Sequence, residues 1–447
     1  MLDRTSGTPS AQGSRTPPEA DFQYDIGDAD DSLEQMRALN ARFGDIYRIY
    51  SPSRARHVYV INHPDDARRV LVSNHANYGR GFGLDRVRVL LGNGLVTSDN
   101  ELWRAQRYMM QPLFHRRVVT RFGELIDTAT EQLMARWERH LAGNEPVNVT
   151  DEMSEVTLEF ILRAIFGTDL DRLTETLGHN PFWLVANNPE RNLSFASQFY
   201  QLRRLVADLA RRRRADPAEH FDFLGMMLAA RAKGTGTPMG ERELVDEVMT
   251  LIIAGHETAA SGLNSAWYLL SQHPEAEARM HAEIDAAAQE HAPSLGATES
   301  LLFTRAVASE ALRLYPPVWL MSRTARGPDV LAGCEIPAGA DVLLSPYLVH
   351  RHPEFWTEPE SFRPERFALD PDAGRARCAY IPFGAGPRHC IGETLALYEM
   401  CMHLYKVARQ YRLRCPMGQS IELEALVNLR TRAPVMMQLE RRGADGS

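Results

Sequence analysis

Apolar and polar residues alternate at helical spacing over most of the chain. Eight segments show this pattern and are long enough for helices: residues 32–43, 103–113, 117–140, 151–166, 201–214, 241–271, 275–289 and 301–314. Segments with strand character are fewer and lie far apart, at residues 58–61, 341–344 and 435–439. The pattern predicts a mainly α fold with small mixed β-sheets.

The two ends of the chain lack this periodicity. Residues 1–24 are rich in Ser, Thr, Pro, Gly and acidic residues and contain no apolar signal-peptide core, so we expect a disordered leader. Residues 441–447 are polar and are expected to form an exposed tail. The interior shows neither a repeat nor a low-complexity linker, which favours one domain over residues 25–440. Gly and Pro are densest between residues 326 and 392, where we expect irregular coil.

Composition and charge exclude several classes of protein. The 447 residues carry 50 Lys and Arg against 58 Asp and Glu, and a net charge of -8 gives no overall attraction to nucleic acid. The five cysteines are odd in number and never closer than eleven positions apart, which suggests neither a disulfide framework nor a CxxC-type zinc site and fits a reducing cytoplasm. Residues 248–270 are long enough to span a bilayer, but His256, Glu257 and Thr258 near their centre favour a buried helix, so no membrane anchor is expected.

The most informative segment is a glycine-rich loop around one cysteine. Residues 383–392 have the sequence FGAGPRHCIG and precede an apolar helix that begins near residue 393. The cation of Arg388 and the N-terminus of that helix both favour the thiolate form of Cys390, a candidate nucleophile or iron ligand. The glycines allow a flat cofactor to approach the backbone. For a lone cysteine, a structural role in a tight turn is the alternative.

The long central helix carries a second polar interruption at residues 254–258, with the sequence AGHET. Gly255 costs about 1 kcal/mol relative to Ala in a helix interior, and a flat cofactor packed against the helix would explain its presence. Thr258 can bind a carbonyl or a water, and Glu257 can supply protons to that water. A bent helix with a satisfied Thr258 and a surface Glu257 is the alternative for this segment alone.

Together, these two segments resemble the cytochrome P450 family. The spacing Phe-x-x-Gly-x-Arg-x-Cys-x-Gly of its haem-binding loop is reproduced, as is its oxygen-activating signature Ala/Gly-Gly-x-Asp/Glu-Thr. The resemblance implies haem b as cofactor, with Cys390 as the axial ligand of the iron. It implies that Thr258 stabilises the activated oxygen and that Glu257 helps to deliver protons. It also places these residues at the cofactor: Ala254, Phe383, Gly384, Arg388 and Gly392.

Two further motifs agree with this resemblance. Glu310 and Arg313 lie three residues apart on one helix face, and Arg366 follows in a Pro-Glu-Arg-Phe segment. Alone, the first two are a common surface pair, but the resemblance implies a buried structural network of all three. It also implies contacts of Trp103, Arg107 and Arg323 with the haem propionates. A helix edge and a loop arginine are the alternative for these last three residues.

The resemblance spans roughly residues 45–439 and implies an enzyme. We expect a monooxygenase that uses O2 to hydroxylate or epoxidise a hydrophobic organic substrate, as in the tailoring of a polyketide, macrolactam or terpenoid. A fatty-acid hydroxylase or a peroxygenase is the alternative, although peroxygenases typically lose the acid–alcohol pair that Glu257 and Thr258 retain. A coupling reaction and a non-enzymatic haem sensor also remain open.

The resemblance locates the substrate pocket and suggests the electron donor. The pocket is expected along residues 81–96, 181–199, 317–320 and 426–429 and beside Leu251 and Ala254, which are nearly all apolar. Asn187, Asn188 and Arg191 are either a polar end of this pocket or solvated loop residues. The chain has no flavin, nicotinamide or iron–sulfur motif, so electrons are expected from an external ferredoxin with its reductase or from a flavodoxin. The docking surface is expected to contain Arg104, Arg116, Arg117, Arg375 and Arg377.

Overall fold

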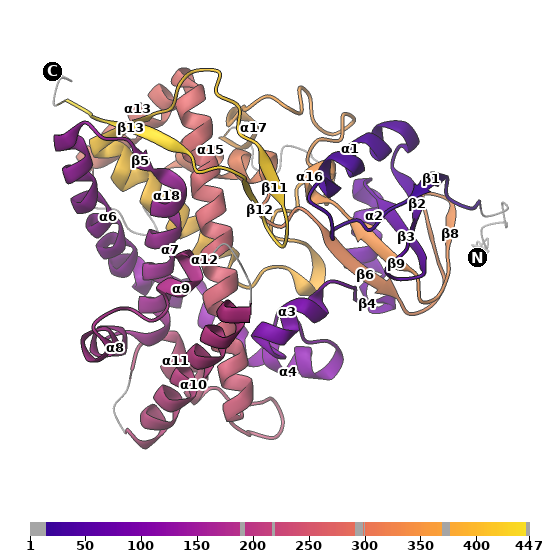
Figure 1. Ribbon diagram of the computed structural model, residues 1–447, viewed down its shortest axis with the longest axis horizontal. Coiled ribbons are helices and arrows are strands. Elements are labelled where there is room, and N and C mark those ends of the chain that lie inside the picture. The colour runs from indigo at the N-terminus through magenta and orange to yellow at the C-terminus, as the bar shows by residue number, and fades with distance from the viewer. Residues whose placement is uncertain are drawn as a thin grey trace, which may run out of the picture.

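The computed structural model describes residues 15–187, 193–216, 220–290, 298, 300–368 and 376–443. The long helix α12 (Glu241–Gln272) runs through the middle of the molecule, with most other helices on one side and the largest sheet on the other (Figure 1). The predicted fold class, mainly α with small mixed sheets, is confirmed. Among the residues that the structure describes, no helix is long and apolar enough to cross a membrane.

Each of the eight predicted helices is present. The other helices, with bounds, are α1 (Ser32–Phe43), α2 (Pro64–Arg68), α3 (Leu84–Leu91), α4 (Asn100–Met110), α5 (Arg116–Val119), α6 (Gly123–Gly143), α7 (Val149–Phe166), α8 (Asp169–Leu177), α9 (Trp183–Asn187), α10 (Leu193–Ala215), α11 (Phe223–Ala229), α13 (Pro274–Glu290), α15 (Leu302–Leu314), α16 (Pro346–Val349), α17 (Glu365–Ala368) and α18 (Glu393–Gln410). The observed bounds differ from the predicted ones mainly at two helices. Two short helical turns precede α6, and α10 begins earlier than predicted, at Leu193.

The largest sheet has six strands in the order β1-β2-β3-β9-β6-β4. These are β1 (Glu19–Gln23), β2 (Ile46–Ser51), β3 (Arg56–Ile61), β9 (Asp341–Leu344), β6 (Met321–Ala325) and β4 (Tyr78–Arg80). Its pairing is mixed, since β3 runs parallel to β9 whereas β6 is antiparallel to both β9 and β4. In the last pair Arg80 lies directly opposite Arg323, which brings two arginines together at the edge of the sheet.

Three smaller sheets complete the fold. They are β5 (Val147–Asn148) with β10 (Tyr411–Arg414) and β13 (Met436–Arg441), β7 (Asp329–Leu331) with β8 (Cys334–Ile336), and β11 (Leu423–Ala425) with β12 (Leu429–Thr431). The four strand pairings in these sheets are all antiparallel. In the described residues between 326 and 392 the helices and strands are short, as the Gly and Pro content predicts.

Strand β1 is a correction to the expected disordered leader. Its neighbouring backbone groups are paired, with Arg48 N–H donating to Pro18 O at 2.8 Å and Tyr24 N–H to Tyr50 O at 3.0 Å. Ala20 is buried, and Glu19 forms an ion pair with Arg48 at 2.5 Å. The expectation is therefore wrong for residues 15–24, because an existing strand supplies their hydrogen bonds; residues 1–14 lie outside the described part of the chain.

Two glycines of α12 allow the helix to pack closely on its neighbours. A Cβ at Gly255 would lie 3.0 Å from Ile161 Cδ1 of α7, and one at Gly262 would lie 3.0 Å from Met400 Cε of α18. The glycine at position 255 thus accommodates α7. The expectation that a flat cofactor packs there is wrong, since Gly255 faces a helix.

Candidate active site

Cys390 ends a tightly hydrogen-bonded loop directly before α18. Its N–H donates to Phe383 O at 2.9 Å, and Gly384 N–H donates to Ile381 O at 3.0 Å. Cys390 lies deep among protein atoms yet keeps solvent-accessible surface, whereas the other four cysteines have almost none. Gly384 and Gly386 both have φ of 72°, which favours glycine. A Cβ at Gly386 would lie 1.9 Å from Leu71 O, so this loop tolerates only glycine at that position.

The electrostatic surroundings of Cys390 differ in part from those expected. Burial raises the pKa of its thiol, and the N–H groups of Gly392 and Glu393 together with the Arg107 guanidinium offset this effect only in part. The helix N-terminus therefore acts as expected, but the cation that favours the thiolate is Arg107 rather than Arg388. A metal ion bound to the sulfur would reverse the balance, because coordination deprotonates a thiol.

Helix α4 braces this loop through two side chains on one of its faces. Arg107 Nη1 donates to His389 O at 2.9 Å, next to Cys390. The Arg388 guanidinium lies over the Trp103 ring, with 4.4 Å between Cζ and the ring centroid. Arg388 also donates to Ser98 O at 3.2 Å and forms an ion pair with Asp99, which caps the N-terminus of α4. Trp103 and Arg107 thus lie beside the loop, and their contacts with the haem propionates stay a prediction.

Three arginines gather where β4, β6 and the Cys390 loop meet. Burial and the neighbouring guanidinium of Arg388 lower the pKa of Arg80 well below its usual range and that of Arg323 to about 10. Asp99 is the carboxylate that faces this group, and it also accepts from Arg326 at 3.3 Å. Positive charge is therefore in excess at a partly buried site. Sequence reasoning missed Arg80, whose position opposite Arg323 depends on strand pairing.

This donor set fits the two propionates of haem b. Two carboxylates placed among Arg80, Arg323 and Arg388 would balance the excess charge and accept their N–H groups. Cys390, on the loop that Arg388 belongs to, would supply the thiolate. The residues present are therefore able to hold a haem with its propionates at the arginines and its iron at the sulfur.

On α12, Ala254 and Thr258 share one side of the helix. Thr258 Oγ1 donates to Ala254 O at 2.7 Å, and Ala254 is exposed although Ile252 and Ala259 are buried. The Glu257 carboxylate accepts from Asn428 Nδ2 at 2.7 Å. His256 instead lies at 2.9 Å from Ser154 Oγ of α7 and is buried.

Helices α12 and α18 pack against each other beyond the two candidate segments in sequence. A Cβ at Gly262 would lie 3.0 Å from Met400 Cε, so the two helices are close at this point. Ala254 and Thr258 precede Gly262 on α12, with Ala254 about 12 Å along the helix at 1.5 Å per residue. Cys390 likewise precedes Met400 in sequence.

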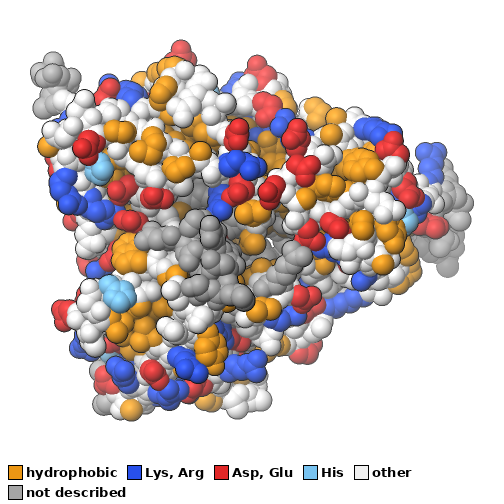
Figure 2. Space-filling model, viewed as in Figure 1, with side chains coloured by type: hydrophobic (Ala, Val, Ile, Leu, Met, Phe, Trp, Pro, Cys, Tyr) orange, Lys and Arg blue, Asp and Glu red, His pale blue; other side chains and the backbone are white. Residues whose placement is uncertain are grey.

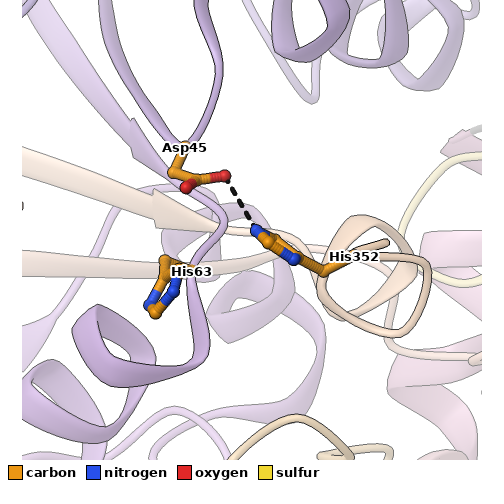
Figure 3. A group of neighbouring side chains, drawn as sticks. All are labelled: Asp45, His63 and His352. Atoms are coloured by element: carbon orange, nitrogen blue, oxygen red, sulfur yellow. Dashed lines mark hydrogen bonds and ion pairs between the residues drawn. The ribbon is translucent and has the colours of Figure 1, made fainter. Parts of the chain in front are cut away.

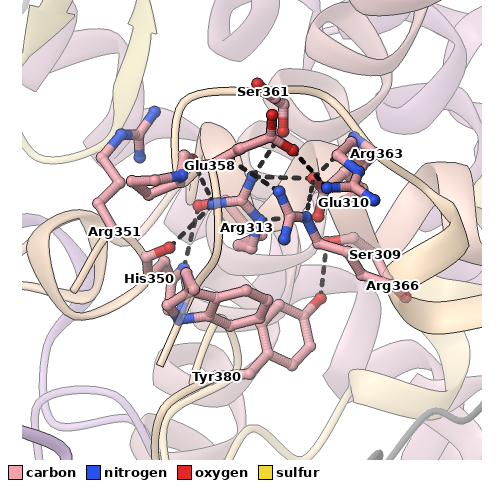
Figure 4. Close-up of polar contacts among 12 residues, drawn as sticks. Ser309, Glu310, Arg313, His350, Arg351, Glu358, Ser361, Arg363, Arg366 and Tyr380 are labelled. Carbon is pink, nitrogen blue, oxygen red and sulfur yellow. Dashed lines mark hydrogen bonds and ion pairs between the residues drawn. The ribbon is translucent and has the colours of Figure 1, made fainter. Parts of the chain in front are cut away.

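The predicted Glu310, Arg313 and Arg366 group is brought together and buried (Figure 4). Arg313 Nε and Nη2 donate to the two Glu310 oxygens at 2.7 and 2.8 Å, and both side chains are fully buried. Arg366 Nε donates to Glu310 Oε1 at 3.2 Å. Arg313 Nη1 also donates to His350 O at 2.9 Å and Pro359 O at 2.7 Å. The network therefore fixes the coil that leads toward Cys390.

His350 extends this network to the cysteine loop. Its Nε2 accepts from Ile381 N–H at 2.8 Å, so the ring proton is on Nδ1, which donates to Arg313 O at 3.1 Å. Burial lowers the pKa of His350 to about 3, which keeps the ring neutral. Ile381 is two residues before Phe383. Nothing in the local sequence around His350 indicates this role, because its partners are distant in the chain.

Among the described residues, Asp45, His63 and His352 form a cluster of side chains of the kinds that bind metal ions (Figure 3). His352 Nε2 lies 3.0 Å from Asp45 Oδ1. However, Nδ1 of His63 accepts from Asp65 N–H at 3.1 Å, and Nδ1 of His352 accepts from Glu354 N–H at 3.3 Å. Both rings therefore carry their proton at Nε2, the nitrogen that a metal ion would need. The hydrogen bonds explain why these three side chains lie together, and a metal site is not inferred.

The predicted pocket and docking residues are only partly described. Leu426 and Val427 are exposed, whereas Leu251 and Phe199 are buried. Arg104 forms an ion pair with Glu101, and charges of both signs are mixed on the face shown in Figure 2. Arg116 and Arg117 begin the short helix α5. Asn188, Arg191 and Arg375 lie outside the described residues.

Known proteins resemble this chain over most of its length. The family model described as Cytochrome P450 matches residues 22–206 and 201–435. Cyclooctatin synthase of Streptomyces melanosporofaciens is 34% identical over 80% of this chain and 81% of its own, and cyclooctat-9-en-7-ol 5-monooxygenase of the same organism is 33% identical over 77% and 78%. Pentalenene oxygenase of Streptomyces avermitilis is 31% identical over 74% and 76%. The crystal structure of the cytochrome P450DA heme domain shares the fold, with a TM-score of 0.83, 24% identity, and coverage of 96% of this chain and 98% of that one. Family match, relatives and fold agree, and the chain belongs to the cytochrome P450 family.

Proposed function

We propose that this cytochrome P450 hydroxylates a terpenoid. The coarser statement follows from its family: it is a haem-dependent monooxygenase that uses O2, an organic substrate and electrons from redox partners. The finer one rests on three relatives, between 31% and 34% identical, whose names refer to cyclooctatin, cyclooctat-9-en-7-ol and pentalenene. A polyketide or macrolactam substrate has no comparable support.

The site residues take these roles in the proposal. Cys390 would supply the thiolate that holds the haem iron, and Arg80, Arg323 and Arg388 would hold the propionates. Haem supplies the activation of O2 when it is bound. Thr258 holds a hydrogen-bonded water or hydroxyl group beside the substrate, and Glu257 moves protons toward it. The turn after β11 brings Leu426 and Val427, 43% and 58% exposed, toward a substrate that is itself apolar.

An external ferredoxin with its reductase, or a flavodoxin, is proposed as the electron donor in the cytoplasm. Arg116 and Arg117, at the start of α5, are two of the described residues of the expected docking surface. Substituting them tests whether the electron donor binds there. Reversing both charges is expected to slow ferredoxin-supported turnover and to weaken its dependence on salt. Unchanged turnover and salt dependence would exclude this surface.

An optical titration of the ferric protein tests the substrate class. Pentalenene and cyclooctat-9-en-7-ol are expected to displace the water on the iron and to shift the haem from low to high spin, with oxygenated products formed when ferredoxin, its reductase and O2 are present. Long-chain fatty acids and a macrolactam serve as comparison compounds. A spin shift with fatty acids alone would establish the fatty-acid alternative, and turnover with peroxide but not with O2 would establish a peroxygenase.

A further inference from the structure

The turn between β11 and β12 is pinned to the body of the fold on both sides. Trp319 Nε1 donates to Leu426 O at 2.9 Å, and Leu429 N–H donates to Pro317 O at 2.8 Å. Ser261 Oγ of α12 donates to Leu429 O at 2.7 Å. Trp319 is itself buried. The backbone of the turn is therefore held at a fixed position against α12.

Asn428 lies between the two anchored residues, Leu426 and Leu429, and its side chain contacts Glu257 of the AGHET segment. Its Nδ2 donates to Glu257 Oε2 at 2.7 Å, across 171 residues of sequence. Glu257 directly precedes Thr258, whose Oγ1 is fixed on Ala254 O. A glutamate in a helix has several side-chain rotamers, and a donor on a pinned turn selects one of them. Since Oε2 already accepts from Asn428, Oε1 is the oxygen of this carboxyl group that is better suited to carry a proton.

We propose that Asn428 is a positioning residue for proton delivery. It holds the Glu257 carboxyl group in the orientation from which Oε1 passes a proton toward Thr258. The turn that supplies Asn428 also carries the exposed apolar side chains of Leu426 and Val427. The acid is thus oriented from the same turn that meets the substrate. This inference rests on the proposed monooxygenase function and adds to it a residue that no local motif contains.

The first experiment tests the contact itself, without turnover. In Asn428→Asp, two carboxylates would share one hydrogen bond, and one of them would keep its proton to a higher pH in the folded state. Folding would then bind a proton that the unfolded chain releases, so stability is expected to fall as the pH rises from about 5 to 8. The charged side chains of strands β11 and β12, Glu424 and Arg430, pair with each other at 2.6 Å.

The thermal midpoint of the holoenzyme is measured at each pH for wild type, Asn428→Asp and Asn428→Asp/Glu257→Gln. The single variant is expected to lose several degrees more than wild type on going from pH 5 to pH 8, and the double variant to lose this extra dependence. Equal pH dependence in all three proteins would overturn the contact and with it the proposal.

The second experiment measures the use of electrons. Asn428→Ala is expected to divert about tenfold more of the consumed electrons to hydrogen peroxide, because a misplaced acid delivers protons poorly. Its affinity for pentalenene, from the spin shift, is expected to remain within about twofold of wild type. Glu424→Gln is the control: it changes a side chain of the same hairpin that pairs with Arg430 rather than with Glu257 or the substrate, and it is expected to change neither the affinity nor the peroxide fraction.

The two failures are distinguishable. If pentalenene and cyclooctat-9-en-7-ol give neither a spin shift nor a product with wild type, the terpenoid assignment fails, whereas the pH experiment and the peroxide fraction in the absence of substrate still test Asn428. If wild type oxidises either compound and Asn428→Ala gives the wild-type peroxide fraction, the positioning role is wrong.

Discussion

The guanidinium of Arg388 stacks on the indole ring of Trp103, and this contact joins helix α4 to the cysteine loop. The same guanidinium binds Asp99, the residue that caps α4. A flat cation can stack and donate several hydrogen bonds at once, which the ammonium of lysine cannot do. The position therefore requires arginine for its shape as well as for its charge.

Arg388→Lys is accordingly expected to weaken haem binding although the charge is kept. We expect haem to be lost to apomyoglobin about tenfold faster than from wild type, because the fork and the stacking contact are missing. Arg326→Lys is the control, since Arg326 binds the same Asp99 but is 45% exposed. Equal haem loss from both variants would show that Arg388 contributes only its charge.

Glu310→Ala is expected to abolish haem incorporation. It leaves the fully buried Arg313 without its bidentate partner, at a cost of about 3–5 kcal/mol. The haem-to-protein ratio and the yield of folded protein measure the effect. Glu365→Ala, which removes a surface pair with Arg279, is expected to change stability by less than about 1 kcal/mol. A Glu310→Ala protein with normal haem content would contradict the structural role of this network.

His350→Phe tests the neutral histidine between Arg313 and Ile381. Removal of both ring nitrogens leaves two buried backbone groups unpaired, which is expected to cost about 2–4 kcal/mol at pH 7.5. Because the pKa of His350 is about 3 in the folded protein and an unperturbed histidine has a pKa of 6.5, only the unfolded chain binds a proton between these values. Wild type therefore loses stability as the pH falls below 6.5, and the difference between the two proteins should narrow by pH 5. Urea unfolding at both pH values measures this, and a constant difference would argue against a neutral buried ring.

Glu247→Gln is expected to stabilise the protein at alkaline pH. Glu247 is fully buried on α12, its Oε2 accepts from Leu95 N–H at 3.0 Å, and burial raises its pKa from 4.5 to about 8. Folded protein therefore holds a proton that the unfolded chain releases, and wild-type stability falls as the pH rises from 4.5 to 8. Glutamine has no such dependence, so its advantage should grow over this range. Unfolding curves at pH 5 and 8 test this, with exposed Glu241→Gln as a control that should show no growing advantage.

The sequence predicts those features that depend on neighbouring residues. Helical periodicity locates α1 to the residue and α12 to within one, and the loop and AGHET motifs are each contiguous in the chain. Glu310 and Arg313 are likewise one helical turn apart. Patterns of this kind are visible because their members share one element.

Contacts between distant segments are not predicted in this way. Arg80 lies in the arginine group because β4 pairs with β6. His350 accepts a hydrogen bond from Ile381 N–H, and Asn428 donates one to Glu257, 171 residues away in sequence. Gly255 is present because of a neighbour, Ile161, that no local pattern identifies. The balance of charge around Cys390 also depends on Arg107, which is remote in sequence.

Strand β1 has a practical consequence for any shortened form of this protein. It forms one edge of the six-stranded sheet and covers β2, in which Ile46, Tyr47 and Ile49 are buried. The polar composition of residues 1–24 suggests that they could be removed. Their removal would leave backbone hydrogen-bonding groups of β2 without partners. An exposed edge of this kind recruits strands from other molecules. Such a protein is expected to aggregate at concentrations where the full chain remains dispersed.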